Sequence, residues 1–287
     1  GGYNPDFDIP VNPWNPDRWA GSSSSGSGVA TALGLCFASL GSDTGGSIRF
    51  PAAACGVVGL KPTWGRVSRY GVLALAESLD HVGPLTRSSA DAGIMLQAIA
   101  GQDDNDPTSL PDAVPDISAQ ISDGVEGIRI GLDERYVADG VDPQLAQAVL
   151  DGVKALEGLG AQIVNIKMPD VDKYLPAWPV LCTAEASVAH RESYPSRRDD
   201  YGPFFSRWLD MGSKLTGSDY AEANVLRNEC NGLVRLVFQD IDVLACPSTI
   251  APPHPVTLES LYGPRDENRG MAFQRFTVPY DFNGAPT

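Results

Sequence analysis

The chain has 287 residues, of which 43% are hydrophobic and 20% charged, a composition that disfavours disordered and fibrous proteins. Its formal net charge of −15 argues against nucleic acid or an anionic membrane as the main partner, because both would be repelled over much of the surface. The sequence contains no apolar run of membrane-spanning length and no recognisable signal peptide, so a cytoplasmic location is the default expectation.

The cysteines give no sign of a metal site or a disulfide framework. They are odd in number and scattered without CxxC spacing, at Cys36, Cys55, Cys182, Cys230 and Cys246. We therefore predict neither a bound metal nor structural disulfides.

The first hundred residues alternate short periodic segments with glycine-rich breaks. Residues 1–19 are rich in proline, asparagine and aspartate and predict an irregular connection. The pattern then predicts short helices at 29–35 and 49–55 and buried strands at 36–40 and 56–60. A stronger helix runs to residue 100, capped by Ser88 or Ser89 and ended by Gly101; its apolar face carries Ala92, Leu96 and Ile99.

The rest of the chain predicts a crossover unit followed by a long helix. A strand at 128–132, a helix from Asp142 and Pro143 to residue 159, and a strand at 161–167 suggest a parallel or mixed sheet. A helix at 221–239 and a strand at 241–246 follow. We expect one α/β domain over residues 1–287, with residues 112–126 as the most plausible hinge.

Residues 20–63 are the most informative stretch, because two glycine- and serine-rich loops flank a short apolar run. In the second loop, GSDTGGSIR, Ser47 follows Thr44, Gly45 and Gly46. A tight turn there could aim backbone N–H groups at one point beside the Ser47 hydroxyl, which is the geometry of an oxyanion hole. No lysine or histidine occurs between residues 1 and 60 to activate either loop's hydroxyl.

Several alternatives to this interpretation remain. The glycines could only make a turn or cradle a phosphate, although the GxxxxGK[ST] and GxGxxG patterns are both absent. A Ser–His–Asp triad would need one of His81, His190 and His254, and none lies in a local catalytic signature. We interpret Asp43 and Arg49, which flank the loop with opposite charges, as a scaffolding pair.

The chain resembles a known family through residues 20–27, GSDTGGSIRFPAAACGVVGLKPT, GRVSRYG and ESLDHVGPLTR, with weaker similarity from AEASVAH and DVLACPST to FTVPYDFNGAPT. These motifs are similar to those of the amidase signature family of serine amidohydrolases. The resemblance implies an α/β fold, with a mixed β-sheet core covered by helices on both faces. It also implies a Ser–cis-Ser–Lys triad that needs no metal or organic cofactor.

The resemblance assigns roles to particular residues. Ser47 matches the acyl-forming nucleophile, and Ser23 matches the bridging serine on a cis peptide bond. Thr44, Gly45, Gly46 and Ser47 match the backbone that binds the substrate oxyanion. The first cluster, AGSSSSGS, departs from the family's usual GGSSGGS, so Ser22 and Ser24 stay open as the bridging residue.

The triad lysine of this family lies upstream of the bridging serine, before Gly1. Lys61 instead matches the structural lysine of the GLKPT motif. We therefore expect the chain to be an internal fragment, truncated at both ends, that is nearly inactive in isolation.

The implied function is hydrolysis of a small or aryl carboxamide to a carboxylate and ammonia or an amine. One rival is the A subunit of a transfer-RNA-dependent amidotransferase, which usually has IRQPA where this chain has IRFPA at 48–52. Another is a catalytically dead scaffold. We expect a small-molecule amide as partner, with a homodimer left open.

Within the single domain, residues 20–101 form the expected signature core and 127–287 the remaining α/β part. Residues 171–217 are the expected substrate-specificity region. Aromatic residues there could line an acyl pocket, although packing is the commoner role for such side chains: Trp178, Tyr201, Phe204 and Phe205.

Overall fold

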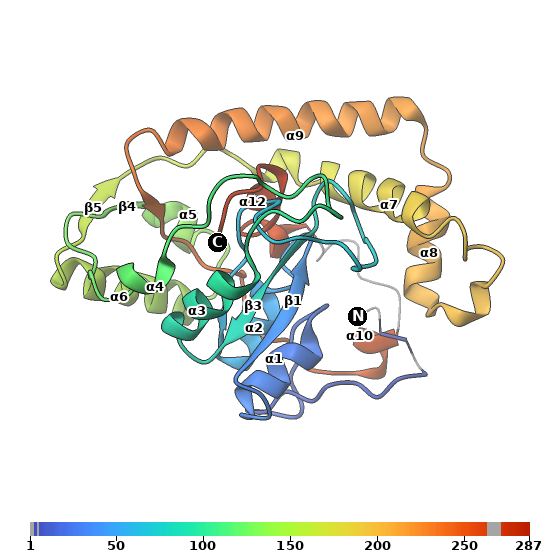
Figure 1. The fold of residues 1–287 in the computed structure, drawn as a ribbon, viewed down its shortest axis with the longest axis horizontal. Coiled ribbons are helices and arrows are strands. Elements are labelled where there is room, and N and C mark those ends of the chain that lie inside the picture. Colours follow the sequence, from blue (N-terminus) through green and yellow to red (C-terminus); the bar gives the residue numbers. More distant parts are fainter. Residues whose placement is uncertain (1–2, 5, 263–270) are drawn as a thin grey trace.

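The structure, a computed structural model, describes residues 3–4, 6–262 and 271–287. It is an α/β fold, as the sequence predicts, with its strands divided between two small sheets (Figure 1). The first sheet carries the serine loops, and the second contains the predicted crossover unit.

The first sheet is antiparallel, in the order β1-β3-β2. Its strands are β1 (Ala38–Asp43), β2 (Val58–Gly59) and β3 (His81–Thr86). All of β3 is buried, and Asp43 at the end of β1 lies opposite His81. Three helices contact this sheet: α1 (Ser25–Ala32), α2 (Arg49–Cys55) and α3 (Ser89–Ile99).

The second sheet is parallel, in the order β5-β4-β6. Its strands are β4 (Arg129–Leu132), β5 (Gln162–Asn165) and β6 (Val243–Leu244). Helix α6 (Pro143–Gly158) connects β4 to β5, preceded by the short α5 (Glu134–Ala138). The predicted strand–helix–strand crossover is thereby confirmed.

Three helices lie along the top and right of Figure 1. Helix α9 (Gly217–Val237) runs along the top, above α7 (Ala177–Ala189). Helix α8 (Pro203–Gly212) lies at the right, below the level of α9. The remaining helical segments are short. They are α4 (Ile117–Gln120), α10 (Leu258–Tyr262), α12 (Val278–Phe282) and the 3-10 turns Asp172–Tyr174, Arg198–Asp200 and Ala272–Gln274.

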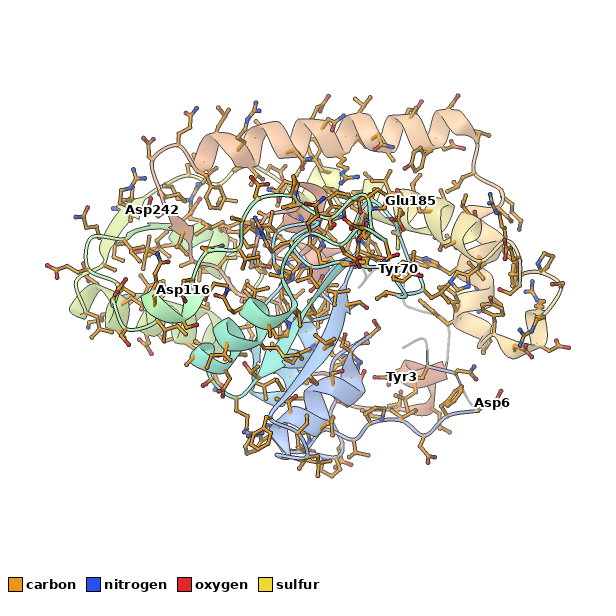
Figure 2. All side chains as sticks on the ribbon, viewed as in Figure 1. Tyr3, Asp6, Tyr70, Asp116, Glu185 and Asp242 are labelled. Carbon is orange, nitrogen blue, oxygen red and sulfur yellow. The ribbon has the colours of Figure 1, made fainter. Side chains whose placement is uncertain are left out.

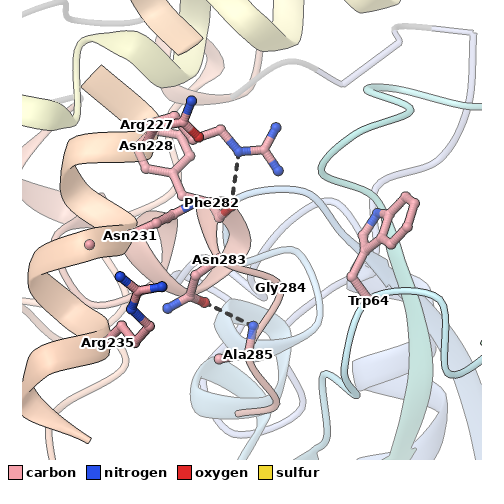
Figure 3. Close-up of a pocket in the computed structure, with 10 residues that line it drawn as sticks. Trp64, Arg227, Asn228, Asn231, Arg235, Phe282, Asn283, Gly284 and Ala285 are labelled. Carbon is pink, nitrogen blue, oxygen red and sulfur yellow. Dashed lines mark hydrogen bonds between the residues drawn. The ribbon is translucent and has the colours of Figure 1, made fainter. Parts of the chain in front are cut away.

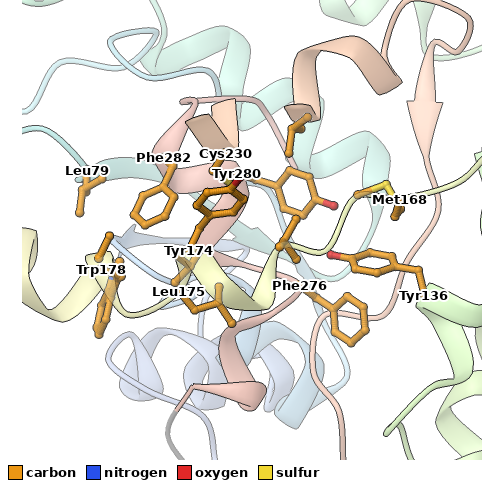
Figure 4. Packing of buried hydrophobic residues seen from close by; sticks show 14 of the residues in the cluster. Leu79, Tyr136, Met168, Tyr174, Leu175, Trp178, Cys230, Phe276, Tyr280 and Phe282 are labelled. Carbon is orange, nitrogen blue, oxygen red and sulfur yellow. The ribbon is translucent and has the colours of Figure 1, made fainter. Parts of the chain in front are cut away.

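The main hydrophobic core joins the second sheet to α7, α9 and α12. Tyr174, Trp178 and Phe276 pack there with Tyr280 and Phe282 (Figure 4). The C-terminal residues 276–282 therefore lie at the centre of the molecule, where they meet the segment that follows β1.

Most sequence-predicted elements are present with shifted ends. Ser88, rather than Ser89, caps α3, because its hydroxyl accepts the Asp91 amide at 3.1 Å. The first helix covers residues 25–32 instead of 29–35, since the chain turns at Gly34 with φ +71°. Helix α9 starts four residues early, at a capping box of Thr216 and Asp219.

The expectation of a buried strand at 36–40 is wrong in part. The strand runs from Ala38 to Asp43, and two of its expected apolar residues are exposed, Phe37 by 89% and Leu40 by 47%. Phe37 precedes the strand, and the buried residues of β1 are Gly41 and Asp43, next to the second serine loop.

Acidic side chains are not confined to one end of the molecule. Asp6, Asp116 and Asp242 are all exposed, and Figure 2 shows Asp6 at the opposite side of the view from Asp116 and Asp242. Among the helices that the structure describes, none combines the length and hydropathy needed to cross a membrane.

Candidate active site

The second serine loop is built around the carboxylate of Asp43. This buried side chain accepts the Gly46 amide at 2.6 Å and the Ile48 amide at 3.0 Å. The Arg49 guanidinium closes the loop with two further bonds to Asp43, at 2.8 and 3.0 Å. The predicted scaffolding pair is confirmed, and it fixes the turn that ends at Ser47.

Arg49 also ties the loop to the C-terminal segment. It donates to Asp281 of α12 at 2.7 Å and to the Thr277 carbonyl at 3.0 Å. Burial alone would raise the pKa of Asp43, but Arg49 outweighs it and the pKa is lowered. Burial raises the pKa of Asp281 to about 8, although Arg49 opposes this. One guanidinium therefore donates hydrogen bonds to two buried carboxyl groups.

Ser47 lies half-buried in the turn before α2, and its neighbours leave little room. A side chain at Gly46, where φ is +124°, would place Cβ 2.3 Å from the Phe50 ring. At Gly45, Cβ would lie 2.7 Å from the indole of Trp178. Only glycine fits either position, so the spacing of the DTGGS motif follows from sterics.

The amides of this loop are not equivalent. The Gly46 amide is bonded to Asp43, so it anchors the loop. Within the described part of the chain, the amides of Thr44, Gly45 and Ser47 donate to no protein acceptor. Of these, the Gly45 and Ser47 amides are the two nearest the Ser47 hydroxyl in the chain, and both are unpaired.

The first serine loop packs directly on the second. The Ser24 amide donates to the Ser47 carbonyl at 3.3 Å, and a side chain at Gly21 would place Cβ 2.3 Å from Pro51. The peptide bond between Ser22 and Ser23 is cis, as the resemblance implies for the bridging serine. Ser23 itself is exposed.

Ser24 is poorly suited to be the bridging residue. Its hydroxyl donates to the Ser42 carbonyl and accepts the Ser42 amide, both at 3.2 Å. These bonds hold the first loop against β1 and occupy the hydroxyl. Among the described contacts, the hydroxyls of Ser22 and Ser23 make no such hydrogen bonds.

Among the described contacts, Lys61, the first lysine in the sequence, does not bind any serine hydroxyl of the two loops. Its completely buried ammonium donates to the carbonyls of Tyr280, at 3.1 Å, and Ala285. It also lies 3.3 Å from Nε2 of His81. Burial lowers the pKa of Lys61 to about 8, with Asp281 opposing the shift. These contacts give Lys61 the structural role expected from the sequence.

The histidines are also engaged elsewhere. Nδ1 of His81 faces the Leu79 carbonyl at 2.7 Å, and burial lowers the pKa of this imidazole to about 3. His190 bonds the Tyr201 hydroxyl at 3.0 Å, and the His254 ring stacks on Trp19. Among the described residues, no lysine or histidine hydrogen-bonds Ser23 or Ser47.

The four aromatic candidates for an acyl pocket separate into two groups. Trp178 reaches the second serine loop, where its Nε1 donates to the Thr44 carbonyl at 2.7 Å. Tyr201, Phe204 and Phe205 belong instead to ring contacts along α8 and its preceding turn. Of these four aromatic residues, Trp178 is the one that contacts the second serine loop, at Thr44 and Gly45.

Two further features lie away from the serines. A cavity of about 610 Å³ between α9 and the segment after α12 is lined by Trp64, Arg227 and Arg235, among others, and by neither Ser23 nor Ser47 (Figure 3). A search of the described residues finds no cluster of three metal-ligating side chains. All five cysteines carry free thiols.

Sequence reasoning missed the residues that hold the loop from afar. Thr277 donates to the Gly45 carbonyl at 2.8 Å, and Asp80 accepts the Thr44 hydroxyl. Both lie in stretches that carry the family resemblance, ESLDHVGPLTR and FTVPYDFNGAPT. That similarity was the available signal, although it does not name the contacts.

Comparison with known sequences finds the amidase family model matching residues 2–287. A Mycobacterium tuberculosis protein, AmiD, whose name proposes an amidase, is 43% identical; the match covers 99% of this chain and 59% of that protein. The glutamyl-tRNA(Gln) amidotransferase A subunit of Akkermansia muciniphila is 38% identical, with 99% and 65% covered. The chain thus spans about three fifths of the length of these relatives.

Solved structures show the same fold. An inhibitor-bound complex described as revealing the origins of an s-triazine catabolic enzyme superposes with a TM-score of 0.85 at 33% identity, covering 96% of this chain and 60% of that one. The glutamyl-tRNA(Gln) amidotransferase A subunit of Thermotoga maritima gives 0.80 at 32%, with the same coverage. The chain therefore belongs to the amidase signature family.

Proposed function

We propose that this chain forms the part of an amidase that carries the acyl-forming serine, and that Ser47 is that serine. The observation that carries the proposal is the loop itself: Asp43 and Arg49 lock a turn in which Ser47 lies beside two amides without a protein acceptor. Such amides stabilise the negative oxygen that forms when a serine attacks a carbonyl.

The reaction proceeds through a seryl acyl-enzyme. Ser47 Oγ attacks the amide carbon and loses its proton through the Ser23 hydroxyl to a base, while the Gly45 and Ser47 amides bind the oxyanion. The proton returns to the leaving nitrogen, which departs as ammonia or an amine. Water then hydrolyses the ester to give the carboxylate and free Ser47.

The proton acceptor that the resemblance implies is a lysine, and it is not one of the described residues. Lys61 is held by two carbonyls and His81 by another, so neither supplies the base. We expect the 287-residue chain alone to hydrolyse amides very slowly. Amide turnover by this chain that Lys61→Ala abolishes would show that the base has been misplaced.

The aromatic residue at position 50 supports a general amidase over the amidotransferase type. The Phe50 ring lies against Gly46 of the nucleophile loop and packs on Phe273, with centroids 4.6 Å apart. The amidotransferase type usually carries a glutamine here, whereas the side chain beside the loop is apolar in our chain. The identity to amidotransferase relatives keeps glutaminase activity as the second candidate.

Hydrolysis assays on the full product of the gene that encodes this chain test the function. We expect release of ammonia from an aryl carboxamide such as benzamide, lost in Ser47→Ala and retained in Ser27→Ala, a matched change within the first serine cluster. Activity on glutamine that requires added partner proteins would instead establish the amidotransferase. Full activity in Ser47→Ala would refute the assignment of the nucleophile.

We propose a cytoplasmic location, supported by five free thiols, since reducing compartments keep cysteines unpaired. A homodimer stays a sequence-based prediction, which size-exclusion chromatography with light scattering tests.

A further inference from the structure

Trp178, near the start of α7, is bound to the backbone of the nucleophile loop. Its Nε1 donates to the Thr44 carbonyl at 2.7 Å, and its ring lies so close to Gly45 that a Cβ there would be 2.7 Å away. Trp178 therefore holds the Thr44–Gly45 peptide unit in two ways: its N–H binds the Thr44 carbonyl, and its ring packs against Gly45.

Fixing the Thr44 carbonyl also fixes the next amide. In a planar trans peptide, the C=O of one residue and the N–H of the next point in opposite directions. Because the Thr44 carbonyl points at Trp178, the Gly45 N–H points away from it. The Gly45 amide donates to no protein acceptor within the described residues.

The neighbouring peptide is held in the same way by a different residue. The Thr277 hydroxyl donates to the Gly45 carbonyl at 2.8 Å, and the following amide, that of Gly46, donates to Asp43. Rotation of the Gly45–Gly46 unit is thus blocked at both ends. The Thr44–Gly45 unit has Trp178 on one side only, so its direction depends on the indole.

Trp178 is itself tightly packed. It is 7% exposed and belongs to the large core cluster with Leu175 and Phe282 (Figure 4). Its ring also contacts that of Trp208 on α8, with centroids 5.6 Å apart. A donor held this firmly orients a backbone group without reorganising during the reaction.

We propose that Trp178 is a positioning residue: through the Thr44 carbonyl, its indole N–H aims the Gly45 amide at the developing oxyanion. This inference rests on the proposed role of Ser47. According to this proposal, Trp178, which lies within residues 171–217, affects the rate of the reaction and not the choice of substrate.

The test compares Trp178→Phe with Trp208→Phe. Both changes replace an indole by a phenyl ring in adjacent, contacting positions, but Nε1 of Trp208 donates to no acceptor among the described residues. In the full gene product, we expect Trp178→Phe to lower kcat by about 10- to 100-fold, since complete removal of one oxyanion donor costs about 100- to 1,000-fold. KM should change little in either variant, and Trp208→Phe should keep kcat.

A second readout does not depend on turnover. In the ¹⁵N-labelled full gene product, we expect the Gly45 amide resonance to shift and its hydrogen exchange to accelerate in Trp178→Phe, with no such change in Trp208→Phe. Thermal unfolding of both variants separates a general loss of packing from this local effect.

The outcomes separate the two proposals. Equal kcat in the two variants, with Ser47→Ala inactive, would overturn the role of Trp178 and leave the nucleophile in place. An unchanged Gly45 resonance in folded Trp178→Phe would also overturn it. Full activity of Ser47→Ala would refute the proposed function, while the Gly45 resonance would still decide whether Trp178 orients this amide.

Discussion

At the scale of single residues, the site depends on a buried charge cluster in which Arg49 joins two carboxyl groups. Asp43 holds the turn, and Asp281 connects it to α12. Burial alone would lower the pKa of Arg49, but both carboxyl groups outweigh it and the pKa is raised. Removing the cation would leave two buried carboxyl groups without their guanidinium partner, which is costly in a medium of low polarity.

We predict that Arg49→Met destabilises the protein by about 3–5 kcal/mol, the cost of breaking a buried ion pair. Chemical denaturation followed by circular dichroism measures the free energy of unfolding. The matched control is Arg129→Met, because Arg129 makes an equally short bond to Asp242 at the surface, where solvent screens the pair. A similar loss in both variants would contradict the special role of the buried pair.

The ring of His81 should remain neutral to low pH. Burial lowers its pKa to about 3, and nearby Lys61 adds to the shift. We predict that NMR shows no titration of this imidazole between pH 8 and pH 5, whereas an unfolded histidine titrates near pH 6.5. A midpoint near 6.5 in the folded protein would contradict the account.

The sign of the stability effect follows from this lowered pKa. On acidification the unfolded chain takes up the proton first, so the contribution is fully present above pH 6.5 and is lost as the pH falls toward 3. The slope is at most about 1.4 kcal/mol per pH unit for one proton.

At the scale of elements, local capping signals predicted the starts of α3 and α6, whereas α1 and α9 each start four residues before the predicted position. Ser88 before α3, Asp142 and Pro143 before α6, and the polar residues around them are capping patterns that depend on near neighbours only. Strand β3 was missed because HVGPLT contains glycine and proline, which disfavour strands, yet its central place in the sheet is set by tertiary packing. Helices α7 and α8 were not predicted either; both lie within residues 171–217, the expected substrate-specificity region.

The cap of α3 gives a local test. We predict that Ser88→Ala lowers stability by about 1 kcal/mol, because it removes the acceptor of the Asp91 amide. Ser89→Ala is the control, since exposed Ser89 is the first helical residue and does not cap. Thermal or urea unfolding checks both, and an equal effect at the two serines would contradict the assignment of the cap.

At the scale of the whole molecule, the site is assembled from segments far apart in the chain. The motifs predicted Ser47, Ser23 and the Asp43–Arg49 pair, because these residues lie within one continuous stretch. They could not predict that Trp178 and Thr277 bind the same loop, since those contacts span 134 and 232 residues. Such contacts depend on how α7 and the C-terminal segment pack into the common core.

The central claim is that Ser47 forms the covalent intermediate, and active-site labelling tests it most directly. The full gene product is treated with a fluorophosphonate probe, digested, and mapped by mass spectrometry. The account predicts a single adduct on Ser47, absent from Ser47→Ala and slower to form in Ser23→Ala. An adduct on another serine, or labelling that persists in Ser47→Ala, would contradict it.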